Sequence, residues 1–139
     1  GKKVVQSLIA QFPNWHFFPL SGFNREQLAN LFLEAKLYID FGHHPGKDRL
    51  PREAAIHGCC VITGLYGSAS NSLDVNIPQA YKIDPQASSF LDNFKKQVNL
   101  IFADFEKCSA EFSDYRHTIS QEQIQFDDQI NQIFSVPAK

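Results

Sequence analysis

The chain has 139 residues, 43% of them hydrophobic and 20% charged, and a formal net charge of −2 at pH 7. These values are typical of one globular domain, and no run of about 18 uninterrupted apolar residues is present to cross a membrane. The slightly negative charge disfavours a nucleic-acid partner, because such partners usually require a strongly basic face.

The first residues, Gly1-Lys2-Lys3, begin a segment that lacks the apolar centre and cleavage site of a secretory signal, so we expect a cytoplasmic protein. The sequence contains no methionine, and Gly1 is typical of a residue left by a cleaved tag. We therefore interpret the chain as a fragment of a longer protein.

Two helices and one strand are predicted in the first 36 residues. Apolar residues at helical spacing predict a helix over residues 4–12, which Pro13 ends. A strand is expected over residues 15–20. The second helix begins after Asn24, a good N-cap with Gln27 in the capping-box position, and runs to about residue 35.

The stretch of residues 37–64 carries the strongest pattern. An apolar run over residues 37–41 predicts a strand, and a basic loop follows it. Pro51 can open a helix and Gly58 can close it, before a second apolar run at residues 59–63. This order is a βαβ unit, which places the loop after its first strand beside a helix N-terminus that suits an anion. A phosphate-bearing ligand is the first hypothesis.

The remaining residues predict a loop at 64–72, a short strand at 80–83, a long helix from 88 or 89 to 105 and a solvated helix at 122–134. Strands that alternate with helices indicate an α/β fold. We expect a single domain over residues 1–139: a three-layer Rossmann-like parallel sheet of about four strands, with helices on both faces and a helical C-terminal extension. The ligand site of such a sheet lies at the carboxyl ends of its strands.

Glu53 is expected in the first turn of its helix, near the mouth of the first loop. A carboxylate there can accept two hydrogen bonds from a vicinal diol such as a ribose. The same position also suits an acid that only complements the helix dipole. Both interpretations stay open.

Three cations, Lys47, Arg49 and Arg52, lie within six residues around this loop. Guanidinium groups bind phosphate through two hydrogen bonds, although a run of charges can also be a solvated face. Gly67 and Ser68 in the second loop offer backbone N–H groups and a hydroxyl without bulk, as close approach to a phosphate requires.

Metal and thiol chemistry are not expected. The side chains of His43 and His44 diverge, and no cysteine or carboxylate completes a ligand set, so we predict neither a metal nor another cofactor. Cys59 and Cys60 lack a partnered base in sequence reach, and as neighbours in a strand they point to opposite faces. We expect Cys59, Cys60 and Cys108 to be reduced thiols.

Residues 21–83 resemble the carboxy-terminal, donor-binding half of GT-B-fold glycosyltransferases. Residues 35–41 match the strand of that family, Arg52-Glu53-Ala54-Ala55 and the residues up to 62 match its Glu-Ala helix and next strand, and residues 67–69 match its glycine-rich turn. The resemblance implies transfer of a sugar from a nucleotide diphosphate sugar to an acceptor.

By this resemblance, Glu53 would hold the ribose, while Gly67 and Ser68 would contact the donor. The cations at positions 47, 49 and 52 would lie near the diphosphate. The family places a second acid with seven residues between it and this glutamate, where the present chain has Pro45. The retaining chemistry that depends on that acid is therefore not implied.

The family also carries a strand ahead of the first helix, and its Gly/Lys-rich loop corresponds to residues 1–3 here. Residues 15–20 are therefore expected either to pair with residues 37–41 or to leave a gap that another chain covers, as in a homo-oligomer. The partner implied by the resemblance is an N-terminal acceptor domain of the same protein. Without it the chain is expected to bind nucleotide weakly and to transfer nothing.

A rival hypothesis comes from another class of protein. A non-catalytic, flavodoxin-like α/β module could use the same end of the sheet to bind a different anion or a protein partner. In that case the pocket would be electronegative or apolar, and Arg49 and Glu53 would be turned away from it.

Overall fold

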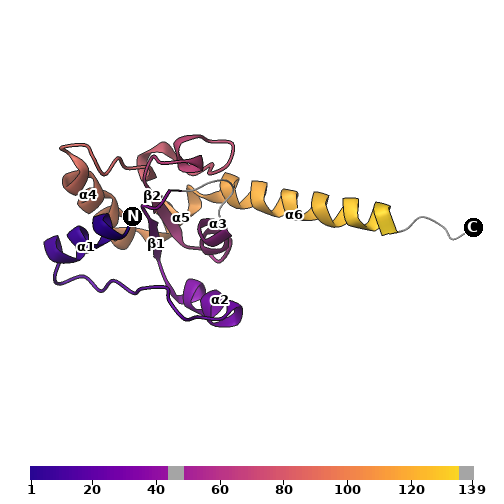
Figure 1. Cartoon of the computed structure of the whole chain (residues 1–139), viewed down its shortest axis with the longest axis horizontal. Helices are drawn as coiled ribbons and strands as arrows, with labels where there is room; N and C mark the ends of the chain where they lie inside the picture. Colours follow the sequence, from indigo (N-terminus) through magenta and orange to yellow (C-terminus); the bar gives the residue numbers. More distant parts are fainter. Residues whose placement is uncertain (44–48, 135–139) are drawn as a thin grey trace, which may run out of the picture.

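The computed structural model of the chain describes residues 1–43 and 49–134. Its regular elements are α1 (Lys2–Gln11), α2 (Arg25–Glu34), β1 (Leu37–Asp40), α3 (Arg49–Ile56), β2 (Cys60–Thr63), the 3₁₀ turns η1 (Ser68–Ser70) and η2 (Gln79–Tyr81), α4 (Phe90–Ala103), α5 (Phe105–Ala110) and α6 (Ser113–Phe134). Figure 1 shows the first five helices gathered around the two strands, while α6 extends away from them.

The described part of the chain is mostly helical and holds a single two-stranded sheet. The predicted four-stranded, three-layer Rossmann-like sheet is therefore wrong. The βαβ unit at its centre is confirmed: β1 and β2 are parallel, with Leu37 opposite Cys60 and Asp40 opposite Thr63. The crossover between them runs through α3, as parallel neighbours require.

Residues 15–20 are not a strand, for two physical reasons. Trp15 stacks on Phe12, with ring centroids 4.2 Å apart and planes 10° apart, and its N–H donates to the Phe12 carbonyl in a turn. Pro19 has no N–H to give to a ladder. The expected pairing of this segment with residues 37–41 is therefore also wrong.

One edge of β1 is consequently unpaired among the described residues. Cys60 N–H donates to the Lys36 carbonyl and Gly64 N–H donates to the Asp40 carbonyl. Alternate residues of a strand direct their backbone groups to opposite edges. The backbone N–H and C=O groups of Leu37 and Ile39 therefore point away from β2.

The expected strand at residues 80–83 is reduced to one bridge. Pro78 opens the turn η2, and only Lys82 then pairs with Thr63, in a parallel bridge. Ile83 N–H donates to the Thr63 carbonyl at 2.9 Å.

The helices agree with expectation where a helix end is marked by residues close to it in the sequence. Asn24 and Gln27 form the predicted capping box at the start of α2, with hydrogen bonds of 2.8 and 3.0 Å. The expected single helix up to residue 105 is instead divided at Asp104, whose side chain caps α5 by accepting from Lys107 N–H. The last helix begins at Ser113, earlier than expected.

The core lies around the two strands. Every residue of β2 is buried. Phe32 of α2 meets Tyr38 edge to face, whereas Phe90 and Phe94 of α4 meet Phe41, which follows β1. Such pairs stabilise a core beyond the area that they bury.

None of the helices in the described ranges is both long and apolar enough to cross a bilayer.

Candidate functional site

The carboxyl ends of β1 and β2 lie at the same end of the sheet, because the strands are parallel. Gly64 N–H donates to the Asp40 carbonyl at 3.3 Å, and a side chain on Gly64 would lie 3.5 Å from the rings of Phe41 and Tyr66. The start of α1 also meets this region, since a Cβ on Gly1 would lie 2.8 Å from the Gly42 nitrogen. Segments distant in sequence are thus joined at one end of the sheet.

Asp40 shapes the turn that leaves β1. Its Oδ1 accepts a hydrogen bond from Gly42 N–H at 2.8 Å, and its Oδ2 accepts one from the Tyr38 hydroxyl at 2.9 Å. From the sequence alone, Asp40 is expected only as part of a strand. The signal that could have identified it is an aspartate two residues before a glycine, a pattern typical of a turn.

Arg49 and Glu53 are brought together on α3. Arg49 Nε lies 3.1 Å from Glu53 Oε1, with side-chain exposures of 59% and 21%. Glu53 is one turn into α3 and not in its first turn as expected, because the helix begins two residues before Pro51. A pair this exposed contributes about 0.2–1 kcal/mol at most, so it stabilises the helix only slightly.

Arg52 has a different partner. Its Nη2 lies 2.7 Å from Oε2 of Glu122, and the two side chains are 20% and 30% exposed. The pair joins α3 to α6, so this guanidinium serves the packing of two helices. Lys47 and His44 lie outside the described residues.

Gly67 and Ser68 form the turn after β2. Gly67 has φ +57° and ψ −134°, a backbone conformation that favours glycine. The hydroxyl of Ser70 donates to the Gly67 carbonyl at 2.7 Å, and Ser68 is only 6% exposed. This turn follows β2, and Arg49 and Glu53 follow β1, so both groups lie after the carboxyl ends of paired strands.

Lys82 is a buried cation beside the same turn, and it is not among the site residues expected from the sequence. Its backbone forms the parallel bridge to Thr63, and its side-chain Nζ donates to the Asn71 carbonyl at 2.8 Å. Burial lowers the pKa of the Lys82 ammonium. The available signal was its position between Tyr81 and Ile83, both buried.

The three cysteines are buried free thiols, as expected. Burial raises the pKa of Cys59 to about 11 and that of Cys60 to about 12. Cys59 Sγ also donates to the Phe32 carbonyl. Thiolates are the reactive form, so neither side chain is suited to nucleophilic catalysis.

Within residues 1–43 and 49–134, no group of three or more His, Cys, Asp or Glu side chains is arranged to hold a metal ion. A scan against protein-family models, a search of curated proteins and a search of solved structures each found no significant match.

Proposed function

We propose that the chain is the donor-binding half of a glycosyltransferase that transfers a sugar from a nucleotide diphosphate sugar. The observation that carries this proposal is the parallel β1–α3–β2 unit. It sets α3, with Arg49 and Glu53, after one strand and Gly67 with Ser68 after its neighbour. Ligands of parallel sheets bind outside the carboxyl ends of strands.

The Arg49–Glu53 pair is compatible with a ligand. It uses Nε of Arg49 and Oε1 of Glu53, and no described residue forms a hydrogen bond or ion pair with Oε2 of Glu53 or the terminal nitrogens of Arg49. Oε2 of Glu53 could accept hydrogen bonds from ribose hydroxyls, and the terminal nitrogens of Arg49 could donate to a diphosphate. In this proposal Glu53 holds ribose, Arg49 and Lys47 lie near the diphosphate, and Gly67 and Ser68 add contacts.

Arg52 is assigned a smaller part, because Glu122 already occupies its guanidinium. In the proposal, an acceptor-binding domain of the same cytoplasmic protein completes the cleft. The isolated chain then binds nucleotide weakly and transfers no sugar.

Titration calorimetry with uridine and guanosine diphosphates tests the donor site. We expect one nucleotide to bind, and Glu53→Gln to weaken it by about tenfold through loss of charged hydrogen bonds. Glu26→Gln is the matched control, since Glu26 is an exposed acid of α2. Absence of binding by either nucleotide, or equal affinity in Glu53→Gln and the control, would overturn the proposal.

A non-catalytic binding or interaction module is the second candidate. The Arg52–Glu122 pair favours it, because that cation stabilises helix packing and is not presented to a ligand. The flavodoxin-like form of this candidate is wrong, since the described sheet has two strands.

A further inference from the structure

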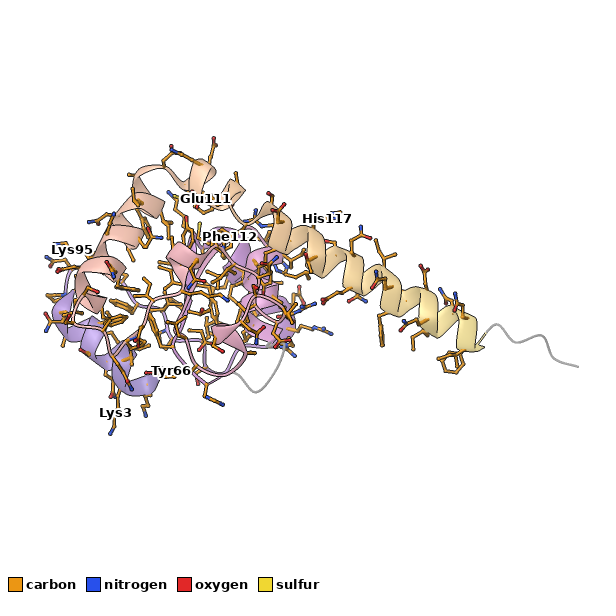
Figure 2. All side chains as sticks on the ribbon, turned by 90° about the horizontal axis from the view of Figure 1, so that it is seen from above. Lys3, Tyr66, Lys95, Glu111, Phe112 and His117 are labelled. Carbon is orange, nitrogen blue, oxygen red and sulfur yellow. The ribbon has the colours of Figure 1, made fainter. Side chains whose placement is uncertain are left out.

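Helix α6 contacts the body only over its first half, up to Glu122. Tyr115 is 2% exposed, Ile119 packs against the core, and Glu122 pairs with Arg52 of α3. Every residue from 123 to 134 is exposed. Figure 2 shows His117 near the base of α6 and the far end of the helix standing clear of the body.

The apolar side of α6 nevertheless continues beyond the body. At 100° per residue, the positions of Tyr115, Ile119, Phe126, Ile130 and Ile133 fall within about 60° of one another. We call the last three of these the distal stripe; its members are 59%, 37% and 65% exposed. An apolar stripe on a helix normally faces a partner, and a short helix without one is marginal in water.

The charged side chains of this part of α6 are all acidic. Residues 118–134 contain Glu122, Asp127 and Asp128 and no Lys, Arg or His. At the covered end, the acid Glu122 is matched by a cation of α3 at 2.7 Å. Asp127, which lies beside the distal stripe, has no ion pair with any described residue, although it accepts from Gln123.

Both the covered and the uncovered parts of α6 combine apolar side chains with a carboxylate, Glu122 on one flank of the apolar side and Asp127 on the other. At the base, Arg52 of α3 supplies the cation for Glu122. We propose that the distal stripe docks onto a helix of a partner protein that presents apolar side chains flanked by Lys or Arg.

The same charges disfavour two other occupants. Pairing of two copies of α6 would gather the acids of both copies without a cation between them, which is unfavourable. An anionic membrane surface would repel the same acids, because interfacial helices usually carry Lys and Arg on their polar face.

The probe is a heptad-repeat peptide with leucine at its core positions and lysine at the flanking positions, so that its own charges keep it monomeric. A control peptide carries glutamate in place of each lysine. We expect calorimetry to show that the lysine peptide binds the chain and that the glutamate peptide binds about tenfold more weakly or not at all.

A double variant, Phe126→Ser with Ile130→Ser, should weaken binding of the lysine peptide by about tenfold or more. Ile124→Ser is the matched control, because Ile124 is 53% exposed on the opposite side of the helix. Both variants lie outside the core, and an unchanged unfolding transition checks that the body remains folded.

Four results would each overturn the proposal. They are no binding of the lysine peptide, equal binding of the two peptides, equal loss of binding in the Ile124→Ser control, and a dimer in sedimentation velocity that the double variant abolishes. Binding to phosphatidylserine vesicles in preference to the lysine peptide would assign the stripe to a membrane surface instead.

Discussion

Cys59 and Cys60 illustrate how burial decides the chemistry of single residues in this chain. Both are fully buried, and burial raises the pKa of Cys59 to about 11 and of Cys60 to about 12. At about pH 8 we expect a disulfide reagent to label neither thiol in the native chain, because the thiolate is almost absent. In urea both should react at once. Mass spectrometry of labelled peptides measures this, and rapid native labelling of either residue would contradict it.

Lys82 gives the chain a dependence on pH. Burial lowers the pKa of its ammonium in the folded state, whereas the unfolded lysine keeps its ordinary pKa. Between those two values the unfolded state holds more protons, so the stability that Lys82 contributes should rise with pH and become constant above the ordinary pKa.

The comparison with Lys82→Met isolates this effect from other titrating groups. As the pH rises toward about 10, near the ordinary pKa of lysine, the free energy of unfolding of the natural chain should increase relative to that of the variant. Urea denaturation at several pH values measures the difference. A constant difference would show that the folded-state pKa is not lowered.

At the scale of elements, Arg116 joins three helices. Its Nε donates to the Ala55 carbonyl at the end of α3, and its Nη1 donates to the Ser109 carbonyl of α5. Its Nη2 contacts Gly58 and Ser109, while Ser109 Oγ also donates to the Gly58 carbonyl. One guanidinium thus binds the Ala55 carbonyl near the end of α3 and the carbonyl of Gly58, which follows α3 and has φ +101°.

We expect Arg116→Ala to lower the free energy of unfolding by about 2–3 kcal/mol, because several partly buried carbonyls lose a charged donor. Arg25→Ala is the control, since Arg25 is exposed at the start of α2 and should change stability by less than about 0.5 kcal/mol. Urea denaturation compares the two. Equal effects would show that the contacts of Arg116 do not stabilise the helix ends.

Elements set by nearby residues were predictable from the sequence. The capping box joins Asn24 to Gln27, three positions on, and the βαβ unit lies within the single continuous stretch of residues 37–63. Strands that need a distant neighbour were not: residues 15–20 and 80–83 had strand-like composition, but a strand is defined by its ladder partner. Pro19 and Pro78 were the local signs against them.

The candidate site was likewise predictable from the sequence only in part. The loops after β1 and β2 follow from the parallel order of the strands, so their common location was predictable. The partner of Arg52 was not, since Glu122 lies 70 residues further along the chain. Neither a charge run nor helical periodicity identifies such a pair.

At the scale of the whole molecule, the protection of backbone amides from hydrogen exchange should fall steeply from the sheet to the far end of α6. Every residue of β2 is buried, while residues 123–134 are all exposed. In dilute solution we expect the amides of β2 to exchange most slowly and those of residues 123–134 to exchange quickest among the helices, since a helix end without tertiary contacts opens readily. Hydrogen exchange by mass spectrometry measures this. Equal protection of both segments would contradict it.

The bonds of Arg116 also bear on the order in which the chain folds. The hydrogen bond from Arg116 to Ala55 spans 61 residues, whereas β1 and β2 are joined across one short crossover. Contacts that close short loops cost less entropy and form earlier. Arg116→Ala should therefore accelerate unfolding and leave the refolding rate nearly unchanged, so stopped-flow kinetics would place this guanidinium on the late side of the barrier.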